Sequence, residues 1–216
     1  MNKTSEKALM YSIGCGDMRA MKHLMDKYLE LISKTAFRIM CDRKDSEAVT
    51  RDVFVHVWNY PEKYDGSIPL EMWMLQITNR YARLRIVRRK VLHILGHRTE
   101  LFVAASPKAA DYDDYVTKQA WELYCRASAH LSPKQRILFT LCVLEQLSQI
   151  QASIITGISR PFIGGLISRA EECIKKELRR YGKADDYDRY IGFLRKVSEG
   201  LSEHEKLKRI IMASIR

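Results

Sequence analysis

Six cationic side chains lie within the eleven residues from Arg80 to Lys90, with no acidic residue among them. They are Arg80, Arg83, Arg85, Arg88, Arg89 and Lys90. Guanidinium and ammonium groups bind phosphate oxygens through charge-assisted hydrogen bonds. Because a helix would spread these positions around its axis, they cannot all pair within the protein. The segment therefore predicts a site that binds a polyanion, and the alternative is a solvated helix end.

A second candidate site has the pattern of a helix-turn-helix. Ser148 and Gln151 have the spacing of a capping box, Gly157 is a helix stop, and Ser159 can cap the next helix. A short helix, a glycine turn and a long helix are typical of DNA-binding proteins, whose second helix enters the major groove. The apolar residues that we expect beneath this second helix are Ile150, Ile154, Ile158, Ile163 and Leu166.

Other chemistries find little support in the residue pattern. His93 and His97 are four residues apart, but Gly96 lies between them and no third ligand is near, which disfavours a metal site. The five cysteines form no Cys-x-x-Cys pair and are expected to be reduced core thiols. The sequence contains no nucleophile triad, carboxylate pair or phosphate-binding loop. We therefore expect no enzyme activity and no cofactor.

Composition and charge favour a nucleic-acid partner. Of the 216 residues, 46% are hydrophobic and 29% are charged, which predicts a globular protein. The net charge is +11, and the positive charge is concentrated before residue 97 and after residue 130. Two basic lobes suggest two contacts on one long anion. The longest uncharged run, Gln146 to Ser159, is too short to span a bilayer, so we expect a cytoplasmic protein without membrane insertion.

The spacing of apolar residues predicts an all-α protein with two helical lobes. Residues 1–96 carry apolar residues every three or four positions, with a helix that begins near Asp45 and Ser46 and another over about 70–95. Residues 97–116 are rich in small and acidic residues and predict a flexible linker. Residues 117–182 form the second lobe, which contains the helix-turn-helix.

Several motifs occur in a fixed order along these lobes. They are Gly16-Asp17 with Ala20, Leu24 and Tyr28; the stretch from Asp42 to Trp58; Trp73 with Ile77 before the arginines; Leu131-Ser-Pro with Arg136; Gly157-Ile158-Ser159; and Ser168-Arg169-Ala170. Together they resemble the bacterial extracytoplasmic-function sigma factors, which belong to the sigma-70 family and direct RNA polymerase to promoters. The resemblance covers roughly residues 16 to 181 and implies a region 2-like helical bundle, a linker and a region 4-like helix-turn-helix domain.

The resemblance also implies roles for individual residues. Arg51 and Asp52 stand at the place of the family's polymerase-facing pair, and His56 lies on the same side of the helix, so the three are expected to bind polymerase. The residues expected to contact the −10 element are Tyr64, Arg80, Arg83, Arg85, Arg88 and Arg89. Those expected to contact the −35 element are Arg160, Gly164, Ser168 and Arg169. The partners implied are core RNA polymerase, promoter DNA and an anti-sigma factor.

Two alternatives to a promoter-specific sigma factor stay open. Pro69-Leu70 and Arg80 replace residues that the family usually carries in its −10 segment, and the second helix of the helix-turn-helix contains Gly164 and Gly165. These departures favour a sigma-like regulator that binds a protein partner and has degenerate promoter recognition. The other alternative, a dimeric repressor with an unrelated effector domain, leaves the arginine-rich helix without a role.

Residues 183–216 form a C-terminal extension beyond the resemblance. Apolar residues recur at helical spacing from Tyr187 to Val197 and again from Leu207 to Ile215, with Gly200 between them and a cap at Ser202. Amphipathic helices this short must bury their apolar faces against another surface. They either complete the core of the second lobe or dock on the lobes as a built-in restraint.

Overall fold

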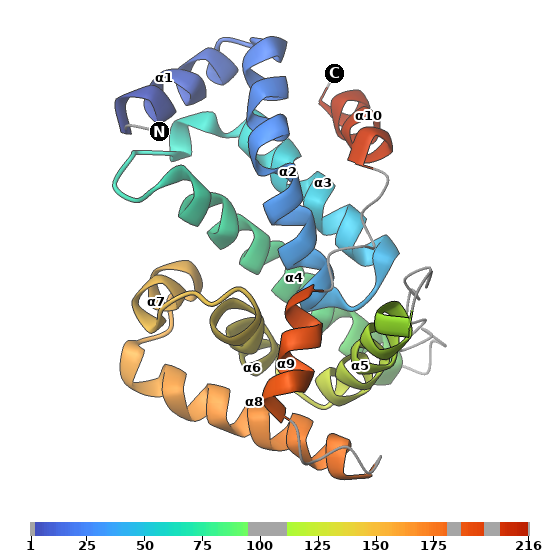
Figure 1. The fold of residues 1–216 in the computed structure, drawn as a ribbon. Helices are drawn as coiled ribbons and strands as arrows, with labels where there is room; N and C mark the ends of the chain where they lie inside the picture. Colours follow the sequence, from blue (N-terminus) through green and yellow to red (C-terminus); the bar gives the residue numbers. More distant parts are fainter. Residues whose placement is uncertain (1–2, 95–111, 181–186, 197–203, 216) are drawn as a thin grey trace.

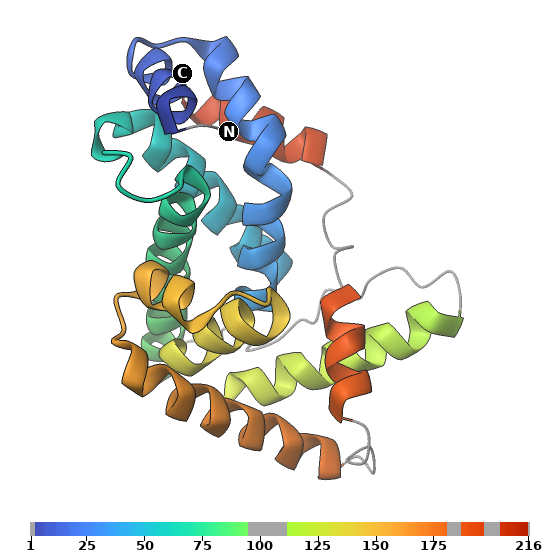
Figure 2. The ribbon, with the colours of Figure 1, turned by 60° about the vertical axis from the view of Figure 1, so that its left-hand side comes forward.

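The described part of the chain is built from helices. A computed structural model describes residues 3–94, 112–180, 187–196 and 204–215, and every regular element within these ranges is helical (Figure 1). The helices form an N-terminal lobe and a C-terminal lobe, and the last two helices add one helix to each (Figures 1 and 2). The expected all-α architecture is therefore confirmed.

The N-terminal lobe is a bundle in which the longest helices pack side by side. Its elements are α1 (Lys3–Gly14), α2 (Met18–Met40), α3 (Arg43–Asn59), the 3-10 turn η1 (Pro61–Lys63) and α4 (Leu70–Ile94). The Asp42 side chain accepts the amide of Asp45 at 2.8 Å, so α3 begins slightly before the expected start. Leu24, Val53 and Met74, each fully buried, belong to the common core of α2, α3 and α4.

The C-terminal lobe contains the expected helix-turn-helix. Its elements are α5 (Tyr112–Ala129), α6 (Pro133–Phe139), the π-helical turn η2 (Thr140–Leu144), α7 (Gln149–Thr156) and α8 (Arg160–Arg180). Since α5 begins at Tyr112, the last residues of the expected linker are helical. The rest of the expected linker, residues 97–111, lies outside the described residues. No described helix alone could span a membrane by length and composition, whereas α7 and α8 pass that test together but are bent by 100°.

The two lobes share one interior. The Phe37 ring of α2 stacks on Trp121 of α5, with ring centroids 4.8 Å apart and planes 16° from parallel. Tyr124 donates its hydroxyl to the Arg38 carbonyl at 3.1 Å, and Arg136 donates to the Met40 carbonyl at 2.9 Å. The C-terminal end of α2 is therefore built into the core of the C-terminal lobe, an arrangement that the sequence pattern did not indicate.

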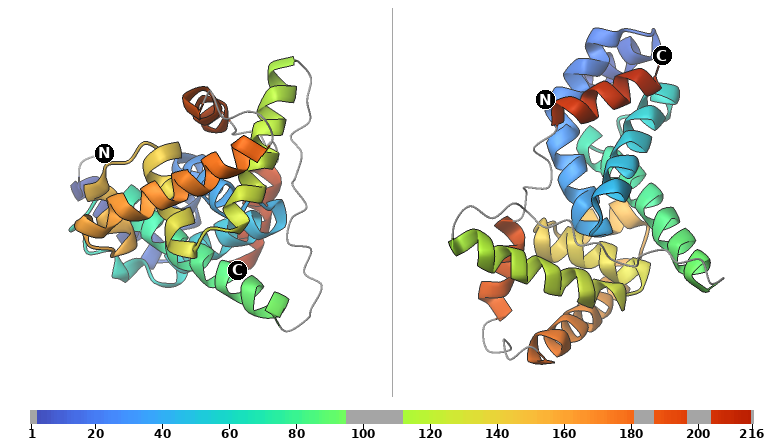
Figure 3. Two further views of the ribbon diagram at one scale, coloured as in Figure 1. Left: turned by 90° about the horizontal axis from the view of Figure 1, so that it is seen from below. Right: turned by 90° about the vertical axis from the view of Figure 1, so that its right-hand side faces the viewer.

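The C-terminal extension divides between the lobes. Helix α9 (Tyr187–Lys196) packs on α5 and η2, and Tyr190 donates its hydroxyl to the Ala120 carbonyl at 3.0 Å. Helix α10 (His204–Ser214) instead lies across α2 and α3 of the N-terminal lobe (Figure 3, right). The two helices expected in this extension are present, and they contact different lobes.

Candidate functional site

The arginine-rich helix α4 has an inward face that neutralises the acids of α3. Arg85 pairs with Asp45 and Asp52, each at 3.2 Å, through its two terminal nitrogens. Arg89 pairs with Asp42 at 3.2 Å and also contacts Asp45. Because these arginines are held by carboxylates, binding a phosphate through them would first require breaking an ion pair. Part of the expected DNA-binding cluster therefore joins α3 to α4 in this structure.

The outward face of α4 keeps its other cations exposed. Arg80, Arg83 and Arg88 are exposed and make no ion pair with any residue that the structure describes. The ammonium group of Lys90 donates to the Leu131 carbonyl at 3.1 Å and so contacts the C-terminal lobe. Exposed apolar residues Leu84, Val87 and Val91 also lie along this half of α4. The three exposed arginines are therefore the members of the cluster available to a polyanion.

The three residues expected to bind polymerase do not all face solvent. Arg51 pairs with Asp52 at 3.0 Å, and Asp52 also pairs with Arg85 of α4. The His56 ring nitrogen Nδ1 lies 3.2 Å from the Tyr81 hydroxyl of α4, and burial, reinforced by the charge of Arg80, lowers the pKa of His56. Asp52 and His56 are therefore engaged by α4, which packs along this side of α3, and the role of the three residues in binding polymerase stays a prediction.

Tyr64, which was expected to contact the −10 element, is an interior residue here. Its side chain is buried, and its hydroxyl donates to Glu6 at 2.7 Å and lies 3.1 Å from the Ile68 carbonyl. Burial, followed by the hydrogen bond to Glu6, raises the pKa of Tyr64 above its usual range. In this arrangement the ring packs beside Trp73 rather than standing free to receive a base.

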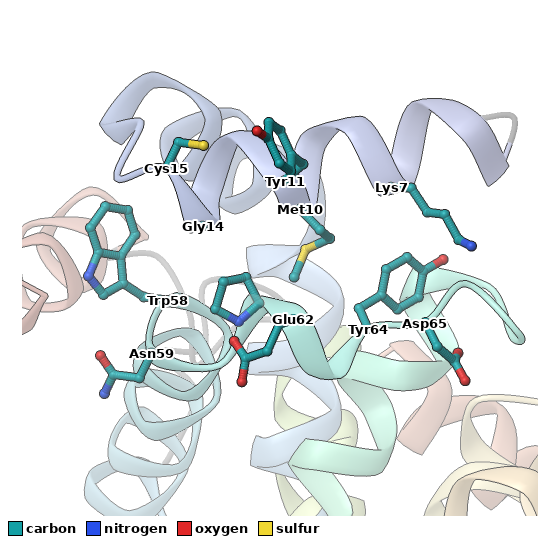
Figure 4. A pocket seen from close by; sticks show the side chains of 11 residues that line it. Lys7, Met10, Tyr11, Gly14, Cys15, Trp58, Asn59, Glu62, Tyr64 and Asp65 are labelled. Carbon is teal, nitrogen blue, oxygen red and sulfur yellow. The ribbon is translucent and has the colours of Figure 1, made fainter.

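A hollow of about 680 Å³ opens beside the Tyr64 loop. Figure 4 shows Lys7, Met10 and Tyr11 reaching it from α1, with Trp58 and Glu62 on the opposite wall. Its lining combines apolar and aromatic residues with charged residues of both signs. Sequence reasoning missed this hollow because α1 was not expected to be a helix.

The helix-turn-helix has the expected turn but a different buried face. The Ser148 hydroxyl accepts the Gln151 amide at 3.3 Å, and Gly157 adopts a left-handed φ of 70° at the end of α7. Ala152 and Ile155 are buried, whereas Ile150 and Ile154 are 52% and 38% exposed. The expectation that Ile150 and Ile154 pack beneath α8 is therefore wrong, since α7 is rotated from the expected phase.

Packing below the second helix follows the expectation more closely. Ile163 is fully buried against Leu138 and Ala152, and Ile158 and Leu166 pack around them. This small cluster holds the start of α8 against α6 and α7. The N-terminal half of α8 is thereby fixed with its other face outward.

The exposed face of α8 carries most of the expected −35 residues. Arg160, Ser168 and Arg169 are exposed, and Gly164 is half-buried. A methyl group added at Gly165 would meet no atom within 4 Å, and one at Gly164 would meet only the Gln149 amide at 3.9 Å. Packing within the protein therefore does not require either glycine. A second hollow of about 380 Å³, with Phe162 and Arg169 on its walls, lies beside Gly165.

Helices α4 and α7 cover part of each other. Gln76 Nε2 donates to the Ile154 carbonyl at 2.8 Å, and Asn79 Nδ2 donates to the Ile155 carbonyl at 3.3 Å. These amides satisfy carbonyls in the last turn of α7 that lack partners within the helix. Two candidate DNA-binding elements, far apart in the sequence, are thus in direct contact.

Metal ligands do not gather in the part of the chain that the structure describes. No three side chains of the His, Cys, Asp or Glu type come together there as a metal site. His97 and the side chain of His93 lie outside the described residues.

Comparison with known proteins supports the fold. The sequence matches no protein-family model and no curated protein. The structure is similar to that of CnrH, solved in complex with the cytosolic domain of CnrY, with a TM-score of 0.57 and 18% sequence identity. The alignment covers 81% of this chain and 97% of the CnrH chain. The chain therefore has a helical fold similar to that of CnrH.

Proposed function

We propose that this chain is a sigma factor of the extracytoplasmic-function type, which binds core RNA polymerase and directs transcription initiation at −10 and −35 elements. The observation that carries the proposal is the fold, because nearly the whole chain of CnrH, a sigma factor of this type, aligns with this structure. The helix-turn-helix of α7 and α8 and the arginine face of α4 supply two separate surfaces for DNA. A sigma-like role in general has the support of this structural likeness.

The exposed cations of α4 and those of α8 contact different promoter elements. Arg80, Arg83 and Arg88 on α4 contact backbone phosphates near the −10 element. Arg160, Ser168 and Arg169 on α8 contact the −35 element from the major groove. Arg51, with Asp52 and His56 beside it, borders the surface of α3 that binds polymerase.

Promoter binding on this proposal requires the lobes to move apart. The contacts from Gln76 and Asn79 cover the first helix of the helix-turn-helix and the neighbouring part of α4. Arg85 and Arg89 stay paired with the acids of α3 until α3 and α4 separate, and only then can they bind phosphates. The closed arrangement is thus a form of the protein that is not bound to a promoter.

A second candidate function is a sigma-like regulator that binds a protein partner, such as an anti-sigma factor, and reads promoters poorly. The mutual cover of α4 and α7 and the glycines of α8 favour it. CnrH was itself solved in complex with another polypeptide, the cytosolic domain of CnrY. A bound anti-sigma factor would hold the two lobes of this chain in a fixed arrangement.

Polymerase capture followed by run-off transcription on a library of promoter fragments tests the proposal. The full chain is expected to bind core polymerase and to start transcription at a subset of fragments. The variant Arg83→Ala/Arg88→Ala should retain capture but lose transcription, because it removes phosphate contacts only. Capture without transcription from any fragment would favour the regulator, and absence of capture would contradict the proposal.

A further inference from the structure

Helix α10 buries its apolar face on the N-terminal lobe. Leu207, Ile211 and Ile215 are 5%, 0% and 7% exposed, and they belong to the hydrophobic cluster formed by α2, α3 and α4. The other side of α10 is exposed, as shown by Glu205, Arg209 and Ala213. Helix α10 is therefore an amphipathic helix packed on α2 and α3, rather than part of the C-terminal lobe.

Two polar contacts fix the position of α10 on α2. Lys208 Nζ lies 2.8 Å from Asp26 Oδ1, and His204 Nε2 lies 3.3 Å from the Ser33 hydroxyl. Residues 204 and 208 are one turn apart on α10, and residues 26 and 33 are two turns apart on α2. The apolar contacts are thus supplemented by a specific register between the two helices. The ion pair lowers the pKa of Asp26 and raises that of Lys208.

The side of α3 that α10 covers can be deduced from the partners of α3. Asp52 and His56 face α4, where they meet Arg85 and Tyr81. The adjoining outer side of α3 carries Val55 and Trp58, which are half-buried against the same cluster as α10.

Arg51 lies four residues before Val55 and seven before Trp58, on the same helical side. Helix α10 packs against both α2 and α3 and contacts α2 at Asp26 and Ser33. Helix α10 therefore packs on α2 and on α3, the helix that carries Arg51.

Helix α9 fastens the same extension to the other lobe. Arg195 donates from Nε to the Val143 carbonyl at 2.9 Å, and its own carbonyl accepts a hydrogen bond from Arg38 of α2. Tyr190 is held by the Ala120 carbonyl of α5. The extension thus contacts both lobes in the closed arrangement, with α10 as the part bound to the N-terminal lobe.

We propose that α10 occupies in cis a docking surface on α2 and α3 that core RNA polymerase uses, so that polymerase binding requires α10 to leave. The inference rests on the proposed function and adds its regulation. The surface that α10 occupies is apolar and carries Asp26, the partner of Lys208, which suits an amphipathic segment of the polymerase that presents a basic residue. An eleven-residue helix is not stable alone in water, so α10 docks reversibly and unfolds or detaches on release.

Full-length variants with opposite charges test the docking without truncating the chain. Lys208→Glu turns the contact with Asp26 into a repulsion, and Asp26→Lys added to it restores an ion pair of reversed polarity. Arg209→Glu, on the exposed side of α10, makes the same change in net charge and is the matched control. Ile211→Glu releases α10 by a second route, through its most buried residue.

Two measurements are made on each variant. Hydrogen exchange with mass spectrometry reports whether α10 is docked in the free protein, and competition for fluorescent core polymerase reports affinity. Lys208→Glu and Ile211→Glu should speed hydrogen exchange in α10 and raise the affinity for polymerase about tenfold. That factor holds if α10 is docked in roughly 90% of the wild-type molecules, because only the remaining tenth can then bind. The doubly reversed variant should return both values toward wild type, and Arg209→Glu should leave both near wild type.

The possible failures are distinguishable. Faster exchange in α10 with unchanged or lower affinity would overturn the inference, because α10 would then be a structural part of the lobe. Unchanged exchange in Lys208→Glu and Ile211→Glu would overturn the docked position itself. Absence of polymerase binding by every protein, including those with released α10, would overturn the proposed function together with the inference.

Discussion

Arg38 of α2 and Glu145, which follows η2, form an ion pair across the two lobes, with Arg38 Nη1 2.8 Å from Glu145 Oε1. The Arg38 side chain is 1% exposed and that of Glu145 is 10% exposed. The same guanidinium also donates to the carbonyls of Leu144 and Arg195. One buried side chain thus joins α2, the end of η2 and α9, and makes the closed arrangement depend on charge pairing.

Removal of the carboxylate should destabilise the closed protein. Glu145→Ala removes the carboxylate paired with the buried guanidinium of Arg38, and loss of one member of a buried pair typically costs about 3 kcal/mol. The free energy of unfolding, measured by urea denaturation, should fall by about that amount. Glu172→Ala, at an exposed position of α8, should change it by less than about 0.5 kcal/mol. Equal stabilities of the two variants would contradict a structural role for the pair.

The outward arginines of α4 should account for part of the salt dependence of promoter binding. Each phosphate contact adds about 0.9 to the slope of log affinity against log salt. Arg83→Ala/Arg88→Ala in the polymerase holoenzyme should therefore flatten the slope by about two units. Arg85→Ala is the contrasting variant, because it removes one of the two arginines that pair with each of Asp45 and Asp52 and should lower stability instead. A slope that is unaltered in the double variant would place those side chains away from DNA.

Local sequence signals predicted the helix ends well. The capping box at Ser148, the stop at Gly157 and the two helices of the extension all occur as expected. These features depend on hydrogen bonds between residues three or four apart, so a linear reading of the sequence contains them. The all-α class follows from the same signals together with the apolar spacing.

Contacts between distant segments were not predictable in this way. The ion pairs of Arg85 and Arg89 depend on acids some forty residues earlier in the sequence, and the stacking of Phe37 on Trp121 joins the two lobes. The π-helical turn at η2 inserts one extra residue per turn after α6, which no local residue type announces. The candidate site was therefore predictable in its residue types, but not in which of them are already paired.

The depressed pKa of His56 should make stability depend on pH. Burial is its main cause, the charges of Arg80 and Lys63 also lower it, and that of Glu62 acts against them. The neutral ring is favoured in the folded state, so the stability is fully present above the unfolded pKa of about 6.5 and is lost as the pH falls through the lower folded value.

Unfolding measured at pH 7 and pH 5 should show a smaller decrease for His56→Gln than for wild type, by less than about 1 kcal/mol because the ring is partly exposed. Arg80→Gln should also reduce the decrease, since it removes one of the charges that lower the pKa. An equal decrease in wild type and both variants would show that His56 does not titrate in this range.

Replacement of Gly165 by alanine should stabilise the folded protein and weaken its binding to DNA. It lies inside α8, where an added methyl group meets no atom within 4 Å, and glycine costs a helix about 0.5–1 kcal/mol relative to alanine. Gly165→Ala should therefore raise the free energy of unfolding by about that amount. Because nothing inside the protein requires the glycine, its remaining use is close approach of a partner, and promoter binding measured on −35 fragments should weaken.

Gly192 of α9 provides the matched control for this substitution. It is also helical with open space around its Cβ position, but it lies in the C-terminal extension, away from the exposed face of α8. Gly192→Ala should give the same stabilisation with no change in DNA binding. If Gly165→Ala also leaves binding unchanged, or strengthens it, the glycines of α8 mark a weakened DNA reader, and the protein-binding regulator becomes the better account of the chain.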